Sequence, residues 1–222
     1  MRFVEAVARL DPLPAALPGS PAALIPVAAR GGTVEARLRA ERELRRDDGS
    51  PLREAAVLVL VHPDERGEAR VVLTERRAYD GHHSGEVSFP GGKVDGDDDG
   101  PVATALREAH EEVGLDPAAC GLRVVGRLEQ VVVAVSGFAI TPVVALAERA
   151  PALVRDPDEV AGILSAPLAA FLPDAPMPVV EREVRGLALR YGIYPVDGLE
   201  IWGATARILG QLGAVIAGAD ER

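Results

Sequence analysis

Residues 94–115, VDGDDDGPVATALREAHEEVGL, carry acidic side chains in two groups separated by an apolar segment. The acidic residues are Asp95, Asp97, Asp98, Asp99, Glu108, Glu111 and Glu112. Oxygen ligands at such spacing are typical of a calcium loop or of the Mg²⁺ site of an enzyme. They are equally typical of an acidic face that is simply solvated, so the neighbouring residues decide among three interpretations.

The first group matches half of an EF-hand calcium loop. That loop has the form D-x-[DN]-x-[DN]-G-x5-E, and Asp95, Asp97, Asp99 and Gly100 fill its first half. Its twelfth position, where a bidentate glutamate should close the coordination sphere, is Leu106. The preceding EVSFPGG is also strand-like, whereas an EF-hand needs an entering helix. The sequence therefore disfavours calcium binding.

The second group lies on a predicted helix over about residues 101–113, with proline in its first turn and Gly114 just past its end. At about 100° per residue, Glu108, Glu111 and Glu112 share one face and the apolar residues share the neighbouring face. Like charges at this spacing cost a few tenths of a kcal/mol each, which a solvated face tolerates. Arg107 beside them and a glycine turn before the helix favour a site for a hard cation such as Mg²⁺.

The elements around this helix predict an α/β (α+β) fold. Strands are expected at 55–61, 69–77, about 122–135, 138–147 and 178–194, with a final helix over about 203–217. Strands outnumber helices without regular alternation, which indicates a mixed β-sheet between α-helices. Trp202 and the final helix are expected to belong to the core. Residues 1–53 are interpreted as an N-terminal extension with a charged helix, and residues 54–222 as the main domain.

Composition excludes several classes of protein. The chain has 222 residues and a formal charge of −10, which argues against a nucleic-acid-binding surface. Cys120 is the only cysteine, so neither an internal disulfide nor a thiolate zinc cluster can form. The apolar run 131–147 contains Ser136, Gly137 and Pro142, which indicates two strands rather than a membrane span. No signal-peptide pattern is seen at the N-terminus, and a cytoplasmic location is expected.

Residues 91–115 resemble the Nudix box, usually written G-x5-E-x7-R-E-U-x-E-E-x-G-U, where U is apolar. The second half of the box is matched by Arg107, Glu108, Ala109, Glu111, Glu112, Gly114 and Leu115. In the first half Gly92 stands fifteen residues before Arg107, one more than usual, and Asp98 or Asp99 replaces the expected glutamate. The resemblance implies a Nudix fold and hydrolysis of a nucleoside diphosphate linked to another group.

The longer loop, and the upstream stretch LTERRAYDGHHSGEVSFPGG (residues 73–92), resemble the coenzyme A pyrophosphatase subgroup of that family. Members of this subgroup cleave the pyrophosphate bond to give 4′-phosphopantetheine and 3′,5′-ADP. The alternatives are another Nudix substrate, such as ADP-ribose or a dinucleoside polyphosphate, and a non-catalytic Nudix-like binding module. The partner implied is a small-molecule substrate. The oligomeric state stays open, with a homodimer among the options.

The resemblance also implies roles for the box. Glu108, Glu111 and Glu112 are expected to hold Mg²⁺, with Mn²⁺ as a substitute, and one carboxylate serves as the base that activates water. Arg107 is expected to orient Glu108 or Glu111 rather than contact the substrate. A loop acid from DPDEVAG, Asp158 or Glu159, is the candidate for an additional catalytic carboxylate.

Residues around the box are candidates for binding the substrate. They are Arg76, Arg77, His83, Lys93, Gly91 and Gly92. The glycines let the backbone approach the metal site, and the basic side chains could attract phosphate to an acidic protein. A polar turn at His83 and an exposed strand end at Arg76 and Arg77 remain equally compatible with the sequence.

Overall fold

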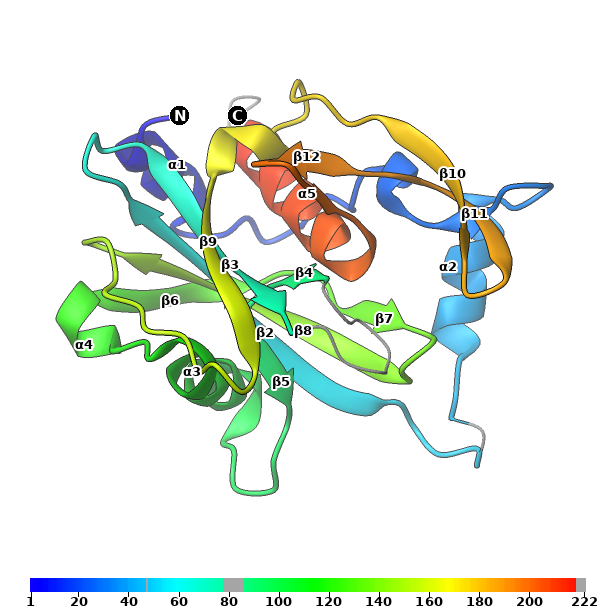
Figure 1. Ribbon diagram of the computed structural model, residues 1–222, viewed down its shortest axis with the longest axis horizontal. Coiled ribbons are helices and arrows are strands. Elements are labelled where there is room, and N and C mark those ends of the chain that lie inside the picture. The colour runs from blue at the N-terminus through cyan, green and yellow to red at the C-terminus, as the bar shows by residue number, and fades with distance from the viewer. Residues whose placement is uncertain (47, 78–85, 219–222) are drawn as a thin grey trace.

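A mixed sheet of eight strands forms the centre of the described part of the chain, residues 1–46, 48–77 and 86–218 of a computed structural model (Figure 1). Strand β2 runs parallel to β8, and the other pairings are antiparallel. The sheet strands are β2 (Arg53–Pro63), β3 (Ala69–Arg76), β4 (Val87–Ser88), β5 (Gly91–Lys93), β6 (Leu122–Arg127), β7 (Val131–Val133), β8 (Phe138–Ala147) and β9 (Val160–Pro167).

Helices cover both faces of this sheet, and Figure 1 shows α3 and α5 on opposite sides of it. The helices are α1 (Phe3–Leu10), α2 (Val34–Glu43), α3 (Gly100–Val113), α4 (Pro117–Cys120) and α5 (Gly203–Gly218), with 3-10 turns η1 (Ala22–Leu24) and η2 (Leu168–Phe171). Alternate residues of β2 divide between two cores: Leu58 packs with α3, whereas Val59 packs with α5 and α1. The predicted mixed sheet between helices is confirmed.

Helix α3 begins and ends close to where the sequence predicts. Proline lies in its first turn, and Gly114 follows it with a φ of 64°, a left-handed conformation that glycine adopts freely. Ala105, Ala109 and Val113 are buried against the sheet. The face that carries Glu108 therefore turns toward β5.

Three expectations about strands need correction. The predicted strand 122–135 is two strands, β6 and β7, because the chain leaves the ladder after Leu128, and the next N–H, of Glu129, donates to Gln211 Oε1 of α5 instead of to β8. The segment 178–194 is a hairpin of β10 (Val179–Val184) and β11 (Leu187–Gly192), followed by a second one of β12 (Tyr194–Val196) and β13 (Leu199–Ile201). Strand β9 is absent from the prediction.

The N-terminal arm packs onto the rest of the chain. Ala6, Leu10 and Leu24 are fully buried in the core beside α5. A short strand, β1 (Val27–Ala28), pairs with β11, so the arm and the C-terminal hairpin form one three-stranded sheet. None of the described helices combines the length and apolar character needed to cross a membrane.

Candidate active site

The glycine pair of β5 lies directly against the acidic face of α3. Gly91 N–H donates to Glu112 Oε2 at 3.0 Å. A Cβ at Gly92 would lie 2.4–2.6 Å from the carboxylate atoms of Glu108. Glycine at position 92 allows the strand backbone to approach Glu108, whereas glycine at position 91 allows close approach to the backbone of β2. The predicted approach of backbone to the acidic helix is thus present in the structure.

Arg107 joins both acidic groups of the sequence. Its Nη1 donates to Glu108 Oε1 at 3.0 Å and to Glu111 Oε2 at 2.9 Å. Its Nε and Nη2 donate to the two oxygens of Asp98 at 3.0 and 2.9 Å. Bidentate guanidinium–carboxylate pairs of this kind fix geometry as well as charge. Arg107 therefore positions the glutamates, as the sequence indicates, and it is itself held by the loop before α3.

Asp98, rather than Asp99, makes the contacts of the loop carboxylate. Besides Arg107, it accepts hydrogen bonds from Thr104 Oγ1 at 2.8 Å and from Asp95 N–H at 2.9 Å. The Arg107 guanidinium holds the pKa of Asp98 well below its usual range. Asp99 instead precedes α3 and forms no side-chain cap hydrogen bond. Of the two aspartates between which the sequence leaves a choice, Asp98 is the one that contacts Arg107.

Burial and like charge distinguish Glu112 and Glu108 from ordinary surface acids. Desolvation raises the pKa of Glu112 to about 7, against the opposing effects of Gly91 N–H and Arg76, with a further increase from Glu108 and Glu159. Desolvation also raises the pKa of Glu108, and Glu111 and Glu159 add to the increase. Carboxylates crowded in this way favour a proton or a cation.

A loop before β9 brings Glu159 to this cluster. Asp156 N–H donates to Glu112 O at 2.8 Å, and Val154 N–H donates to Val113 O at 3.0 Å, so the loop is attached to the end of α3. Glu159 lies close enough to raise the pKa of both Glu108 and Glu112. Asp158 points elsewhere and forms an exposed ion pair with Arg77 at 3.6 Å.

The donor set suits a hard divalent cation, because every candidate ligand atom is a carboxylate oxygen. Among the described residues, Glu108 Oε2 and Glu112 Oε1 accept no hydrogen bond, and both belong to carboxylates that touch β5. No three His, Cys, Asp or Glu side chains of the described ranges converge tightly enough to hold a metal ion as they stand. Glu111, like Glu108, accepts from Arg107 through one oxygen only, and in Glu111 that oxygen is Oε2.

A cavity of about 590 Å³ opens beside β5. Its floor is made of residues on the α5 side of the sheet, and Arg76, Lys93, Gly91 and Gly92 are among the residues that line it. The positive charge of Arg76 also lowers the pKa of Glu112, so this cavity residue interacts electrostatically with the acidic cluster.

Other predicted substrate residues are placed differently. Arg77 lies outside the described lining of this cavity, beside Asp158. His83 falls in 78–85, outside the described residues. Trp202, expected to be core, is half-buried, stacks on Tyr191 with ring centroids 5.1 Å apart and lines the cavity. Its place after a β-strand and before a helix gave no indication of this role.

A mixed sheet between helices, with an Arg-Glu-x-x-Glu-Glu helix docked on a Gly-Gly strand, defines a protein of the Nudix class. The chain belongs to the NUDIX family: the family model described as NUDIX domain matches residues 52–177. Members of this family generally use divalent metal ions.

Relatives agree with this assignment. "Nudix hydrolase 15, mitochondrial" of Arabidopsis thaliana is 37% identical over 173 residues, which cover 72% of this chain and 58% of that protein. "Uncharacterized Nudix hydrolase NudL" of Salmonella newport is 37% identical over 164 residues, which cover 74% of this chain and 83% of that protein. The match thus spans somewhat over half of the plant protein. The predicted enzyme class, a Nudix hydrolase, is confirmed at the level of the family.

A solved structure shows the same fold. The MutT/nudix family protein from Enterococcus faecalis superposes with a TM-score of 0.50 and 14% identity, over 86% of this chain and 71% of that one. At this identity the likeness concerns the fold alone.

Proposed function

We propose that the protein hydrolyses the pyrophosphate bond of coenzyme A or of a coenzyme A derivative, giving 4′-phosphopantetheine and 3′,5′-ADP, with Mg²⁺ as the cofactor. The observation that carries this proposal is the contact of the α3 carboxylates with the Gly91–Gly92 backbone, which also lines a cavity of basic and apolar residues. Acidic side chains there suit cations, and the cavity suits a long anionic substrate.

The chemistry is attack of water on one phosphorus of the diphosphate. A new P–O bond forms, the bridging oxygen leaves with the other phosphate, and the proton of the attacking water passes to a carboxylate. A bound divalent cation neutralises the phosphate oxygens and makes hydroxide available near neutral pH. Glu108, Glu111 and Glu112 would hold it.

The remaining residues position the reacting groups. Arg107 fixes Glu108 and Glu111, and the N–H of Gly91 fixes Glu112. We assign the proton-accepting role to Glu159 or to one of the three glutamates, because Glu159 lies within electrostatic range of Glu108 and Glu112 without an ion pair to Arg107. Arg76 and Lys93, which line the cavity, would attract the phosphates.

The coenzyme A assignment is supported by the stretch of residues 73–92, which resembles the subgroup signature, and by the character of the cavity. Apolar residues such as Phe89, Phe138 and Trp202 share its wall with the basic ones. A pantetheine arm and an adenine ring need apolar surface, whereas the phosphates need cations.

The test is incubation of the protein and MgCl₂ with coenzyme A, ADP-ribose and diadenosine polyphosphates, with the products identified by mass spectrometry. Release of 4′-phosphopantetheine and 3′,5′-ADP from coenzyme A, at a higher kcat/KM than for the other compounds, is expected. Good turnover of ADP-ribose or of a dinucleoside polyphosphate without turnover of coenzyme A would overturn the substrate. No turnover of any compound would favour a binding module.

A further inference from the structure

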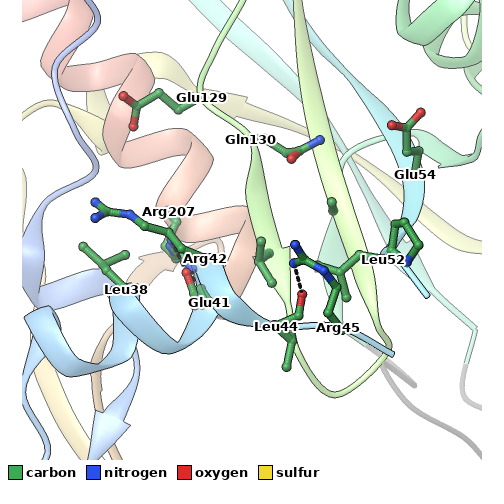
Figure 2. A pocket seen from close by; sticks show the side chains of 13 residues that line it. Leu38, Glu41, Arg42, Leu44, Arg45, Leu52, Glu54, Glu129, Gln130 and Arg207 are labelled. Atoms are coloured by element: carbon green, nitrogen blue, oxygen red, sulfur yellow. Dashed lines mark hydrogen bonds and ion pairs between the residues drawn. The ribbon is translucent and has the colours of Figure 1, made fainter. Parts of the chain in front are cut away.

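The cavity wall contains a buried group of charges that the Nudix box does not include. Arg207 of α5 donates from Nη1 and Nη2 to the two oxygens of Glu41 of α2, at 3.0 and 3.1 Å. Arg37, one turn earlier in α2, donates from Nε to Glu41 Oε1 at 2.8 Å. Figure 2 shows Arg207 and Glu41 beside each other where they border a neighbouring cleft. Two arginines share one carboxylate, so this triad carries a net charge of +1.

This charge is buried and incompletely paired. Arg207 is 7% exposed and Glu41 is 7% exposed, while Arg37 is about one third exposed. The Nε of Arg207 is buried and finds no hydrogen-bond acceptor within the described residues. A buried donor without an acceptor, in a group with excess positive charge, is costly unless an anion or polar ligand completes it.

Both arginines of the triad line the cavity of the proposed active site. The basic residues of its described lining are Arg37, Arg76, Lys93, Arg185 and Arg207. Glu86 is the acidic residue in that lining, on a protein whose overall charge is −10. The concentration of cations therefore belongs to the cavity and does not reflect composition.

The triad lies toward β7 (Val131–Val133), whereas the acidic cluster contacts β5. Register pairs Lys93 of β5 with Ala55 of β2, Ala55 with Ile140 of β8, and Ile140 with Val131 of β7. Three inter-strand steps separate β5 from β7 by roughly 14 Å. Helix α5 contacts β7, and Gln211 Oε1 of α5 accepts from the N–H of Glu129, two residues before β7. Arg207 lies one turn before Gln211 in the same helix.

We infer that this end of the cavity binds a second anionic group of the substrate, a phosphate monoester separate from the scissile pyrophosphate, through Arg37 and Arg207. Guanidinium groups suit phosphate because they present several donors in a plane. Arg37, about one third exposed, would contact that phosphate, whereas Arg207, whose Nε is buried, would contribute its positive charge. The inference rests on the proposed function, in which coenzyme A carries such a phosphate on its ribose.

The triad gives the N-terminal arm a part in recognition. Arg37 belongs to α2, and Pro26 of the same arm also lines the cavity. A purely structural triad would only attach α2 to α5, and its arginines would have no effect on which nucleotide binds. The two interpretations differ in ligand preference, which can be measured.

The experiment compares binding of adenosine 3′,5′-bisphosphate and 5′-AMP by calorimetry, for the full chain and for the variants Arg37→Gln, Arg207→Gln and Arg42→Gln. Arg42 is the matched control, since it lies on α2 and lines the neighbouring cleft but not the described cavity. We expect the unsubstituted protein to prefer the bisphosphate at least tenfold, and Arg37→Gln to reduce that preference about tenfold. Arg42→Gln should leave it unchanged.

An equal affinity of the unsubstituted protein for the two nucleotides would overturn the inference, as would a preference that Arg37→Gln does not alter. Loss of the preference in Arg42→Gln to the same extent would also overturn it, because the effect would then be one of general charge. If Arg207→Gln fails to fold, the half-buried Arg37 decides the outcome. Binding is measured without turnover, so failure of coenzyme A hydrolysis is seen separately.

Discussion

Adjacent glycines in β5 should respond in opposite ways to the same substitution. A Cβ at Gly92 would meet the carboxylate of Glu108 at 2.4–2.6 Å, and that carboxylate is the end of a flexible side chain. Ordinary contact begins at 3.4 Å, so Glu108 must move by about 1 Å in Gly92→Ala. A displacement of this size at a reacting group costs about 10²-fold in rate. The fold should survive because no backbone atom has to shift.

Gly91→Ala is the matched control. Its Cβ would lie 2.4 Å from Ala56 O and 2.5 Å from Val57 Cα, and the φ of Gly91 is 150°. Backbone atoms inside a sheet cannot move aside, and side chains rarely adopt this φ. We expect a loss of about 2 kcal/mol or more in the free energy of unfolding. For a chain of this size that corresponds to a melting temperature lower by roughly 4–8 °C.

The assay pairs thermal unfolding with steady-state kinetics on coenzyme A. Gly92→Ala should melt within about 2 °C of the unsubstituted protein, the small shift expected when no buried group is lost, and lose about two orders of magnitude in kcat. Gly91→Ala should instead show its main effect as a lower melting temperature. Full kcat in Gly92→Ala would refute the role given to the position of Glu108. An equal loss of stability in both variants would show that the contact at Gly92 supports the fold and not the chemistry.

Three further substitutions test the cluster. Glu112→Gln should lower kcat by two or more orders of magnitude, as expected for loss of a charged metal ligand. The melting temperature should stay unchanged, because the amide keeps the shape of the side chain and can still accept from Gly91 N–H. Near-normal turnover would show that Glu112 does not belong to the site. Glu159→Gln should lower kcat while KM stays nearly constant, and a change in KM alone would indicate a binding role. Asp98→Asn should destabilise the protein at neutral pH. Because Arg107 lowers the pKa of Asp98, the stabilisation is present above the ordinary value of 3.8 and decreases as the pH falls below it, so the two proteins should converge in acid denaturation.

Local signals explain what the sequence predicted well. Helix α3 has proline at its start and Gly114 at its end, and its glutamates and apolar residues divide between two faces. Strand β8 is an apolar run interrupted only by Thr141 and bounded by Gly137 and Glu148. These elements are determined by residues within a few positions of one another, and their predicted bounds differ little from the observed ones.

Elements that depend on distant partners were missed or wrongly divided. Strand β9 has little alternation, and it is a strand because seven of its residues pair with β3, far earlier in the chain. The β10–β11 hairpin turns at Arg185–Gly186 with φ values of 55° and 77°, and arginine at the first position carries no hairpin signal. Arg207 looks like one polar residue in an apolar helix until Glu41 is seen beside it.

Strand β5 contacts the acidic cluster on one face of the sheet and lines the cavity on the other. Ala56, which pairs with Gly92, packs on the α3 side, whereas Ala55 and Val57 line the cavity on the α5 side. Because β5 carries glycine at its edge, a phosphate held there can meet the carboxylates of one face while the rest of the substrate lies on the other. Inorganic pyrophosphate would reach only this edge and would leave the rest of the cavity unoccupied. It should therefore be cleaved with a lower kcat, and not only a higher KM, than coenzyme A, because contacts remote from the reacting bond contribute to positioning it.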